Sequence, residues 1–134
     1  MPMQENMIIN FCRSWKRQIH PLSDIEFQKK SWFHQEGTEV STFEEETGNL
    51  IQRYEDHIRI PEYQLLYQNE AGKLIKLLCD KVDEYRNDSH SLLNSDIEEK
   101  FFSDSKWLSI VSLAKKVDRA LDDQIKEVEN GHSK

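Results

Sequence analysis

The chain has 134 residues and a formal net charge of −7 at neutral pH, from 25 acidic and 18 basic side chains. This length is typical of one domain, which can bury about two-thirds of its unfolded surface without a metal ion or disulfides. The negative charge repels a polyanion as a whole, which disfavours nucleic acid as a partner. We therefore expect a single globular domain over residues 1–134 that does not bind nucleic acid.

Turn-forming residues are scarce, since the chain contains only four glycines and three prolines. A β-sandwich or β-barrel needs frequent turns, whereas long stretches without glycine or proline favour helices. The predicted fold class is therefore all-α, as a single compact bundle of five or six helices.

The two cysteines and the hydropathy pattern bear on the compartment. Cys12 and Cys79 are too few and too far apart for a disulfide framework or a zinc site, and both lie at apolar-periodic positions. We predict two reduced core thiols. No stretch approaches the roughly 18 to 20 apolar residues of a membrane span, and the N-terminus lacks the apolar region of a signal peptide. We expect a cytoplasmic protein without membrane association.

The first two predicted helices follow from an apolar stripe and a capping pattern. The stripe predicts a helix over residues 5–19 that ends before Pro21. Ser23, followed three residues later by Glu26, matches a capping box, which predicts a shorter helix that fades near Gly37.

A third helix is predicted from Ser41, which repeats the capping-box spacing, to about Ile58, before Pro61 stops or resets it. Three consecutive glutamates beginning at Glu44 then occupy its first turn. The positive end of the helix dipole stabilises such side chains by about 0.3 to 1 kcal/mol each. Helix stabilisation alone can therefore explain these glutamates.

The second half of the chain predicts three further helical segments. The longest pattern covers residues 62–86, and Gly72 marks either a close helix crossing or a break after residue 69. A loop over residues 87–94 and a short helix over residues 95–102 follow. The last helix has the clearest apolar stripe, which begins at Trp107, runs for six turns and ends at residues 130–131.

No pattern of chemistry-bearing residues typical of an enzyme is present. A metal site would need His, Cys, Asp or Glu at helical ligand spacing, and nucleophilic catalysis would need a Ser, Cys or Thr beside a base. The glycines are isolated, so a phosphate-binding glycine loop is also missing. We predict no catalytic residues, no cofactor and no metal ion.

The strongest local feature is an acidic segment without Lys or Arg, whose five carboxylates are Glu36, Glu39, Glu44, Glu45 and Glu46. Asp56 extends this feature if it shares a helix face with the glutamates. Clustered negative charge steers a cationic partner and raises its association rate. These six residues are our candidate partner-binding residues, and the alternative is a solvated loop and helix start.

Three sequence motifs resemble those of small helical immunity proteins of bacterial toxin systems, of which contact-dependent growth inhibition is the best known. They are Trp32, Glu39-Val40-Ser41-Thr42-Phe43-Glu44-Glu45 and Asp104-Ser105-Lys106-Trp107-Leu108-x-Ile110. The resemblance covers roughly half the chain. It implies a cytosolic protein that binds the toxic domain of one cognate effector, often a nuclease, and blocks its active site or substrate groove.

The predicted function is therefore an acidic, non-enzymatic inhibitor that neutralises a basic toxin domain by charge complementarity. The alternative is a helical structural or regulatory protein that assembles as a homodimer or larger homo-oligomer through one apolar helix face. Mimicry of nucleic acid is a third hypothesis, which the Lys and Arg residues after Glu46 disfavour.

Overall fold

The structure is a computed structural model that describes residues 5–34, 42–88 and 98–130. Within these ranges the regular elements are seven α-helices, one π-helical turn and one 3-10 turn, which confirms the all-α prediction. Seven α-helices exceed the five or six predicted, because the pattern over residues 62–86 divides into two helices at Asn69.

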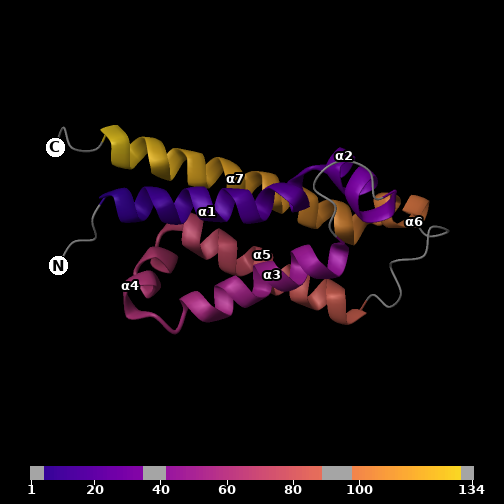
Figure 1. Ribbon diagram of the computed structural model, residues 1–134, viewed down its shortest axis with the longest axis horizontal. Coiled ribbons are helices and arrows are strands. Elements are labelled where there is room, and N and C mark those ends of the chain that lie inside the picture. Colours follow the sequence, from indigo (N-terminus) through magenta and orange to yellow (C-terminus); the bar gives the residue numbers. More distant parts are fainter. Residues whose placement is uncertain (1–4, 35–41, 89–97, 131–134) are drawn as a thin grey trace.

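Four long helices form the body of the bundle: α1 (Glu5–Ser23), α3 (Phe43–His57), α5 (Glu70–Asp88) and α7 (Ser105–Asn130). Helices α1 and α7 lie side by side and run in opposite directions, and α3 and α5 form a second layer against them (Figure 1). Helix α7 packs on both α1 and α5, and α3 packs on the same two helices. The apolar stripes of all four helices therefore meet in one core.

Short elements close the two ends of the bundle. At one end lie α2 (Ile25–Gln28), its π-helical continuation η1 (Lys29–Phe33) and α6 (Glu98–Ser103), and at the other end lie α4 (Pro61–Gln64) and η2 (Leu66–Gln68) (Figure 1).

Each end is filled by an aromatic cluster. The cluster at the α6 end comprises Trp32, Phe43, Tyr85, Phe101 and Trp107. The cluster at the α4 end comprises Phe11, Trp15, Tyr54, His57, Tyr63 and Tyr67.

Helix α1 continues through Pro21, so the prediction that this proline ends it was wrong. A proline lacks the backbone N–H, which costs the helix one hydrogen bond, and α1 ends two residues later at Ser23. The buried side-chain amide of Gln28 donates to the carbonyls of Pro21 and Leu22, at 2.9 Å each. These bonds satisfy carbonyls that a helix end leaves without partners.

Both predicted capping boxes are shifted by one residue. Asp24 caps α2 in place of Ser23, and its carboxylate accepts from the N–H three residues on, at 3.0 Å. Thr42 caps α3, and its hydroxyl accepts from the N–H of Glu45 at 3.1 Å. Ser41, the predicted cap, lies outside the described residues. The predicted end of this helix near Ile58 is confirmed, because Ile58 is its C-cap.

Gly72 lies both at a break in the helix and at a close crossing of the chain, which are the two interpretations that the sequence leaves open. Asn69 has extended backbone between η2 and α5, and its side chain accepts from the N–H of Gly72 at 2.8 Å, so the helix is broken there. A Cβ at Gly72 would lie 2.3 Å from the carbonyl oxygen of Leu66 and 2.3 Å from the Cα of Tyr67. The chain therefore crosses itself too closely for a side chain.

The remaining sequence predictions have mixed outcomes. Helix α7 ends at Asn130 as predicted. The short helix α6 spans Glu98–Ser103 instead of residues 95–102, and the described part of the predicted loop at 87–88 belongs to α5.

Cys12 and Cys79 are buried and free, and burial raises the pKa of the Cys12 thiol to about 11. No helix among the described residues is long and apolar enough to cross a membrane.

Replacing Gly72 with alanine should destabilise the protein, although helix propensity alone predicts a gain of about 1 kcal/mol. The added Cβ meets backbone atoms that cannot rotate away, so we expect a loss of about 1 to 3 kcal/mol in the free energy of unfolding in urea. Gly48→Ala is the control, because its nearest neighbour is the flexible Arg86 side chain at 3.4 Å. A Gly72→Ala variant as stable as Gly48→Ala would contradict the close crossing.

Candidate functional site

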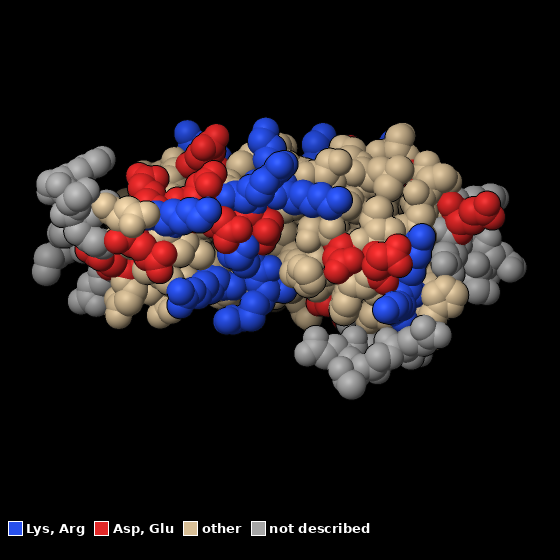
Figure 2. Space-filling view, turned by 90° about the horizontal axis from the view of Figure 1, so that it is seen from above, with Lys and Arg blue, Asp and Glu red and all other residues tan. Residues whose placement is uncertain are grey.

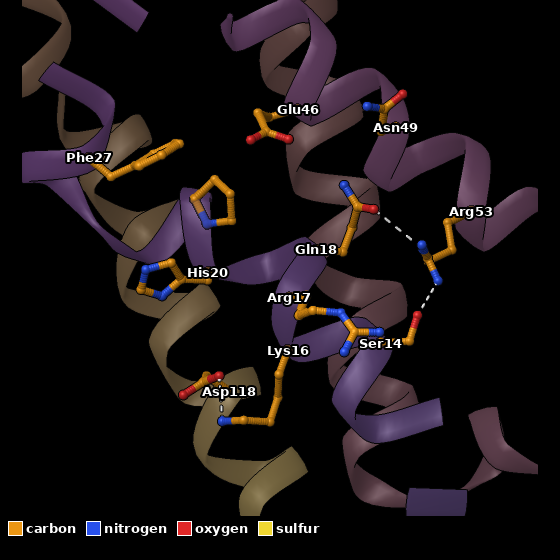
Figure 3. A pocket seen from close by; sticks show the side chains of 11 residues that line it. Ser14, Lys16, Arg17, Gln18, His20, Phe27, Glu46, Asn49, Arg53 and Asp118 are labelled. Carbon is orange, nitrogen blue, oxygen red and sulfur yellow. Dashed lines mark hydrogen bonds and ion pairs between the residues drawn. The ribbon is translucent and has the colours of Figure 1, made fainter. Parts of the chain in front are cut away.

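A groove runs along the junction of α1 and α3, and we name it the α1–α3 groove. It consists of three adjoining hollows of about 650, 470 and 590 Å³, and the side chain of Arg53 lines all three. The hollow nearest α2 is drawn in Figure 3. These volumes are comparable to those of ligand-binding pockets, so the groove is a candidate binding site.

Arg53 extends from the flank of α3 across to α1. Its Nε donates to the side-chain oxygen of Gln18 at 3.3 Å, and its Nη1 donates to the hydroxyl of Ser14 (Figure 3). The guanidinium carbon lies 5.9 Å from the ring centroid of Trp15, which is cation–π geometry. Both acceptors are neutral, and none of the ion pairs in the described part of the chain includes Arg53. Its positive charge is therefore held in place but not neutralised.

Two cationic side chains of α1, Lys16 and Arg17, line the groove, and they differ in whether a carboxylate pairs with them. Lys16 lies 2.9 Å from Asp118 and 2.8 Å from Asp122, which ties α1 to α7. Burial opposes the charged form of Lys16, but these two carboxylates outweigh it and raise the lysine pKa. Arg17 is exposed and forms no ion pair or hydrogen bond through its side chain with the described residues. Figure 3 shows the guanidinium groups of Arg17 and Arg53 both directed toward Ser14.

A hydrogen-bonded chain of three side chains stands behind the groove. The indole Nε1 of Trp15 donates to the hydroxyl oxygen of Tyr67 at 3.0 Å, and this oxygen lies 2.8 Å from Nδ1 of His57. Burial strongly raises the pKa of Tyr67, so its hydroxyl keeps its proton, and the tautomer of His57 decides which of the two groups donates in their hydrogen bond. Burial and then the nearby Arg53 lower the pKa of His57, against an opposing effect of Asp56. This environment therefore favours the neutral form of His57.

Aromatic rings complete this wall of the groove. The ring of Tyr63 stacks on His57 with centroids 4.3 Å apart, and Phe11 lies 6.0 Å from Tyr63. His57 and Tyr63 line two of the three hollows. The wall therefore offers apolar surface beside the guanidinium groups.

Three exposed glutamates of α3, Glu44, Glu45 and Glu55, line none of the three hollows, whereas the exposed Asp56 lines the hollow of about 590 Å³. Glu45 and Asp56 are eleven positions apart, which places them within about 20° of each other around the helix, and Glu44 and Glu55 form a second such pair. All four side chains are exposed, and no ion pair among the described residues includes any of them. We name these four residues the acidic ridge. Asp56 also accepts a hydrogen bond from Gln52 at 2.9 Å.

The other predicted site residues do not join the acidic ridge. Glu46 is half-buried and lines the hollow between α1 and α3, although it belongs to the same first turn as Glu44 and Glu45. Glu36 and Glu39 lie outside the described residues. The six candidate residues therefore do not form one surface in the described part of the structure.

Sequence reasoning missed Arg17, Arg53, His57 and Tyr63. A signal for them does exist, because Asn6, Asn10, Ser14 and Arg17 recur at helical spacing beside the apolar stripe of α1, and Arg53 and His57 are four residues apart. The pattern does not say that these two flanks face each other.

Comparison of the chain with protein-family models, with curated proteins and with solved structures gives no match. The described residues also contain no group of three or more His, Cys, Asp or Glu side chains that could hold a metal ion. The acidic ridge and the α1–α3 groove are therefore the two candidate functional surfaces of the described residues.

The depressed pKa of His57 predicts a pH-dependent stability. An unfolded histidine titrates near pH 6.5, above the folded value, so the unfolded chain binds more protons below about pH 6.5. The free energy of unfolding should therefore fall as the pH falls from about 6.5. Urea denaturation of His57→Gln should show a shallower fall than the wild type. Equal slopes in the two proteins would rule out the role of His57.

Proposed function

We propose that this protein is a non-enzymatic inhibitor that binds a basic protein partner, of the immunity type that the sequence resembles. The observation that supports this proposal is the acidic ridge. Its four carboxylates are exposed on one helix, and no cation among the described residues pairs with them. Charges that the fold leaves unused are free to pair with a partner.

Side chains suited to anchor a partner lie beside the acidic ridge. Asp56 lines the same hollow as Ile60, which is 38% exposed, and the half-buried Tyr63. Binding energy at interfaces concentrates in a few aromatic or apolar anchors, and charged residues at the rim steer the encounter. Asp56 and Tyr63 therefore combine both kinds of contact at one end of α3.

The distribution of charge over the molecule also fits a localised acidic surface. Figure 2 shows that the face above α1 and α7 carries basic and acidic side chains interspersed, with a basic band across its centre. On this face Asp118 and Asp122 of α7 pair with Lys16 of α1, whereas no ion pair among the described residues includes the exposed carboxylates of α3. A nuclease presents a cationic groove to phosphate, so an acidic helix that occupies such a groove excludes the substrate.

Charge reversal on the acidic ridge should abolish partner capture. Tagged wild-type protein, incubated with lysate of the cells that naturally make it, should recover one basic protein in low salt and less of it in about 0.5 M salt. Glu45→Lys with Asp56→Lys should lower recovery at least about tenfold, through repulsion and loss of steering. Asp123→Lys with Glu127→Lys, which changes the net charge equally on α7, should leave recovery unchanged.

Equal loss in both double variants would show that net charge matters and the ridge does not. Co-expression supplies a second readout, because the captured partner should stop growth when produced alone and permit growth when produced with the wild-type inhibitor. A partner that is harmless alone would contradict the immunity assignment.

A second candidate, assembly into a homo-oligomer, is favoured by an apolar corner between α3 and α4. Ile58, Ile60 and Leu65 are 39%, 38% and 58% exposed there. Exposed large apolar side chains that are close in the chain can mark a protein interface.

Sedimentation equilibrium separates the two candidates. If the protein is an inhibitor, we expect a monomer of 16.0 kDa at micromolar concentration, unchanged by Leu65→Glu. An oligomer that Leu65→Glu dissociates would favour self-assembly and would make the apolar corner its interface.

A further inference from the structure

The hollow of the α1–α3 groove that extends toward the start of α1, of about 470 Å³, has an unusual charge for an acidic protein. Arg17, Arg53 and His57 line it, together with the neutral polar side chains of Asn6, Asn10 and Ser14, and no described carboxylate does. The neighbouring hollow, by contrast, is lined by Glu46 and Asp118. Two guanidinium groups that share a hollow without a carboxylate repel each other unless an anion lies between them.

The hollow is also rich in hydrogen-bond donors that the described residues leave unused. The Arg17 guanidinium and the amides of Asn6 and Asn10 have no hydrogen-bond partner there, and Arg53 uses only its Nε and Nη1. The hydroxyl of Ser14 accepts from Arg53 and keeps its own proton to donate. Nδ1 of His57 lies 2.8 Å from the Tyr67 hydroxyl, and its Nε2 forms no hydrogen bond with the described residues.

We propose that this hollow binds the phosphate group of a small phosphorylated molecule. A guanidinium presents a planar fork of N–H donors that can bind two oxygens of an oxyanion at once. Two guanidinium groups and the neutral donors of the hollow together offer more hydrogen bonds than the two oxygens of one carboxylate can accept well. A phosphate has more acceptor oxygens and a higher charge, so it satisfies this donor set better. The hollow is larger than a bare phosphate, and the rings of Phe11 and Tyr63 line the rest of it.

This site does not depend on the proposed inhibitor function. It uses the hollow of about 470 Å³, which no residue of the acidic ridge lines, and the one ridge residue that reaches the groove, Asp56, lines a different hollow. The variants that test the two sites share no residue, so either proposal can fail alone.

Titration of the full chain with phenyl phosphate and with inorganic phosphate, followed by NMR amide shifts, tests the proposal. We expect saturable binding, in the millimolar range for inorganic phosphate and about tenfold tighter for phenyl phosphate, because its ring adds apolar contact. The shifts should centre on residues 6–17 of α1 and residues 53–57 of α3. Benzoate serves as the carboxylate comparison, and sodium chloride at equal ionic strength is the salt control.

Arg17→Gln is the main test variant, because Arg17 is exposed and its loss should not affect folding. We expect it to weaken phenyl phosphate binding at least about tenfold, and Arg53→Lys to weaken it as well, since lysine keeps the charge but loses the fork. Arg13→Gln is the matched control, because Arg13 is exposed on the same helix, does not line the hollow and should leave affinity unchanged.

Three results would overturn the proposal. Benzoate binding as tight as phenyl phosphate would mean that the hollow does not select phosphate. Equal weakening by Arg13→Gln would show attraction to the surface as a whole. Shifts that sodium chloride reproduces, or that do not saturate, would mean that the hollow is not a binding site.

Discussion

The buried indole N–H of Trp15 constrains the arrangement around the α1–α3 groove. Trp15 is fully buried in α1, and leaving its N–H without an acceptor would cost about 1 to 3 kcal/mol. The hydroxyl of Tyr67 supplies that acceptor, which holds η2 against α1, and the same hydroxyl reaches His57 on α3. The face of the Trp15 ring also receives Arg53. Trp15 of α1 thus positions η2 through Tyr67, and it positions the α3 wall of the groove through His57 and Arg53.

The other end of the bundle repeats this solution with different residues. The indole N–H of Trp107 donates to the side-chain oxygen of Gln28 at 3.0 Å, and the amide nitrogen of Gln28 satisfies the end of α1. No buried side-chain nitrogen or oxygen in the described residues lacks a hydrogen-bond partner. Apolar stripes bring the four long helices together, but they tolerate sliding. Trp15 and Trp107 allow little sliding, because the indole N–H of each must meet one particular oxygen.

The contrast between apolar stripes, which are local, and single hydrogen bonds between distant residues explains what could be predicted from the sequence. The long helices follow from local periodicity, so α3 and α7 end where their patterns predict. The continuation of α1 through Pro21 depends on Gln28, which approaches from outside the helix, and periodicity carries no such information. Exposure of Glu44 and Glu45 is a local property of a first helical turn. The meeting of Arg17 with Arg53 depends on which flanks of two helices face each other, which only packing decides.

Helix α3 keeps opposite charges available on two of its faces because they do not pair with each other. Arg53 and Asp56 are three residues apart, a spacing at which an ion pair commonly forms on a helix. Arg53 is instead drawn toward α1 by Trp15, Ser14 and Gln18, and Asp56 accepts from Gln52 on its own face. An Arg53–Asp56 pair would neutralise the acidic ridge and the groove together. The packing of Arg53 on Trp15 therefore keeps the charge of Arg53 on the flank of α3 that faces α1, and it leaves the carboxylate of Asp56 without an ion pair among the described residues.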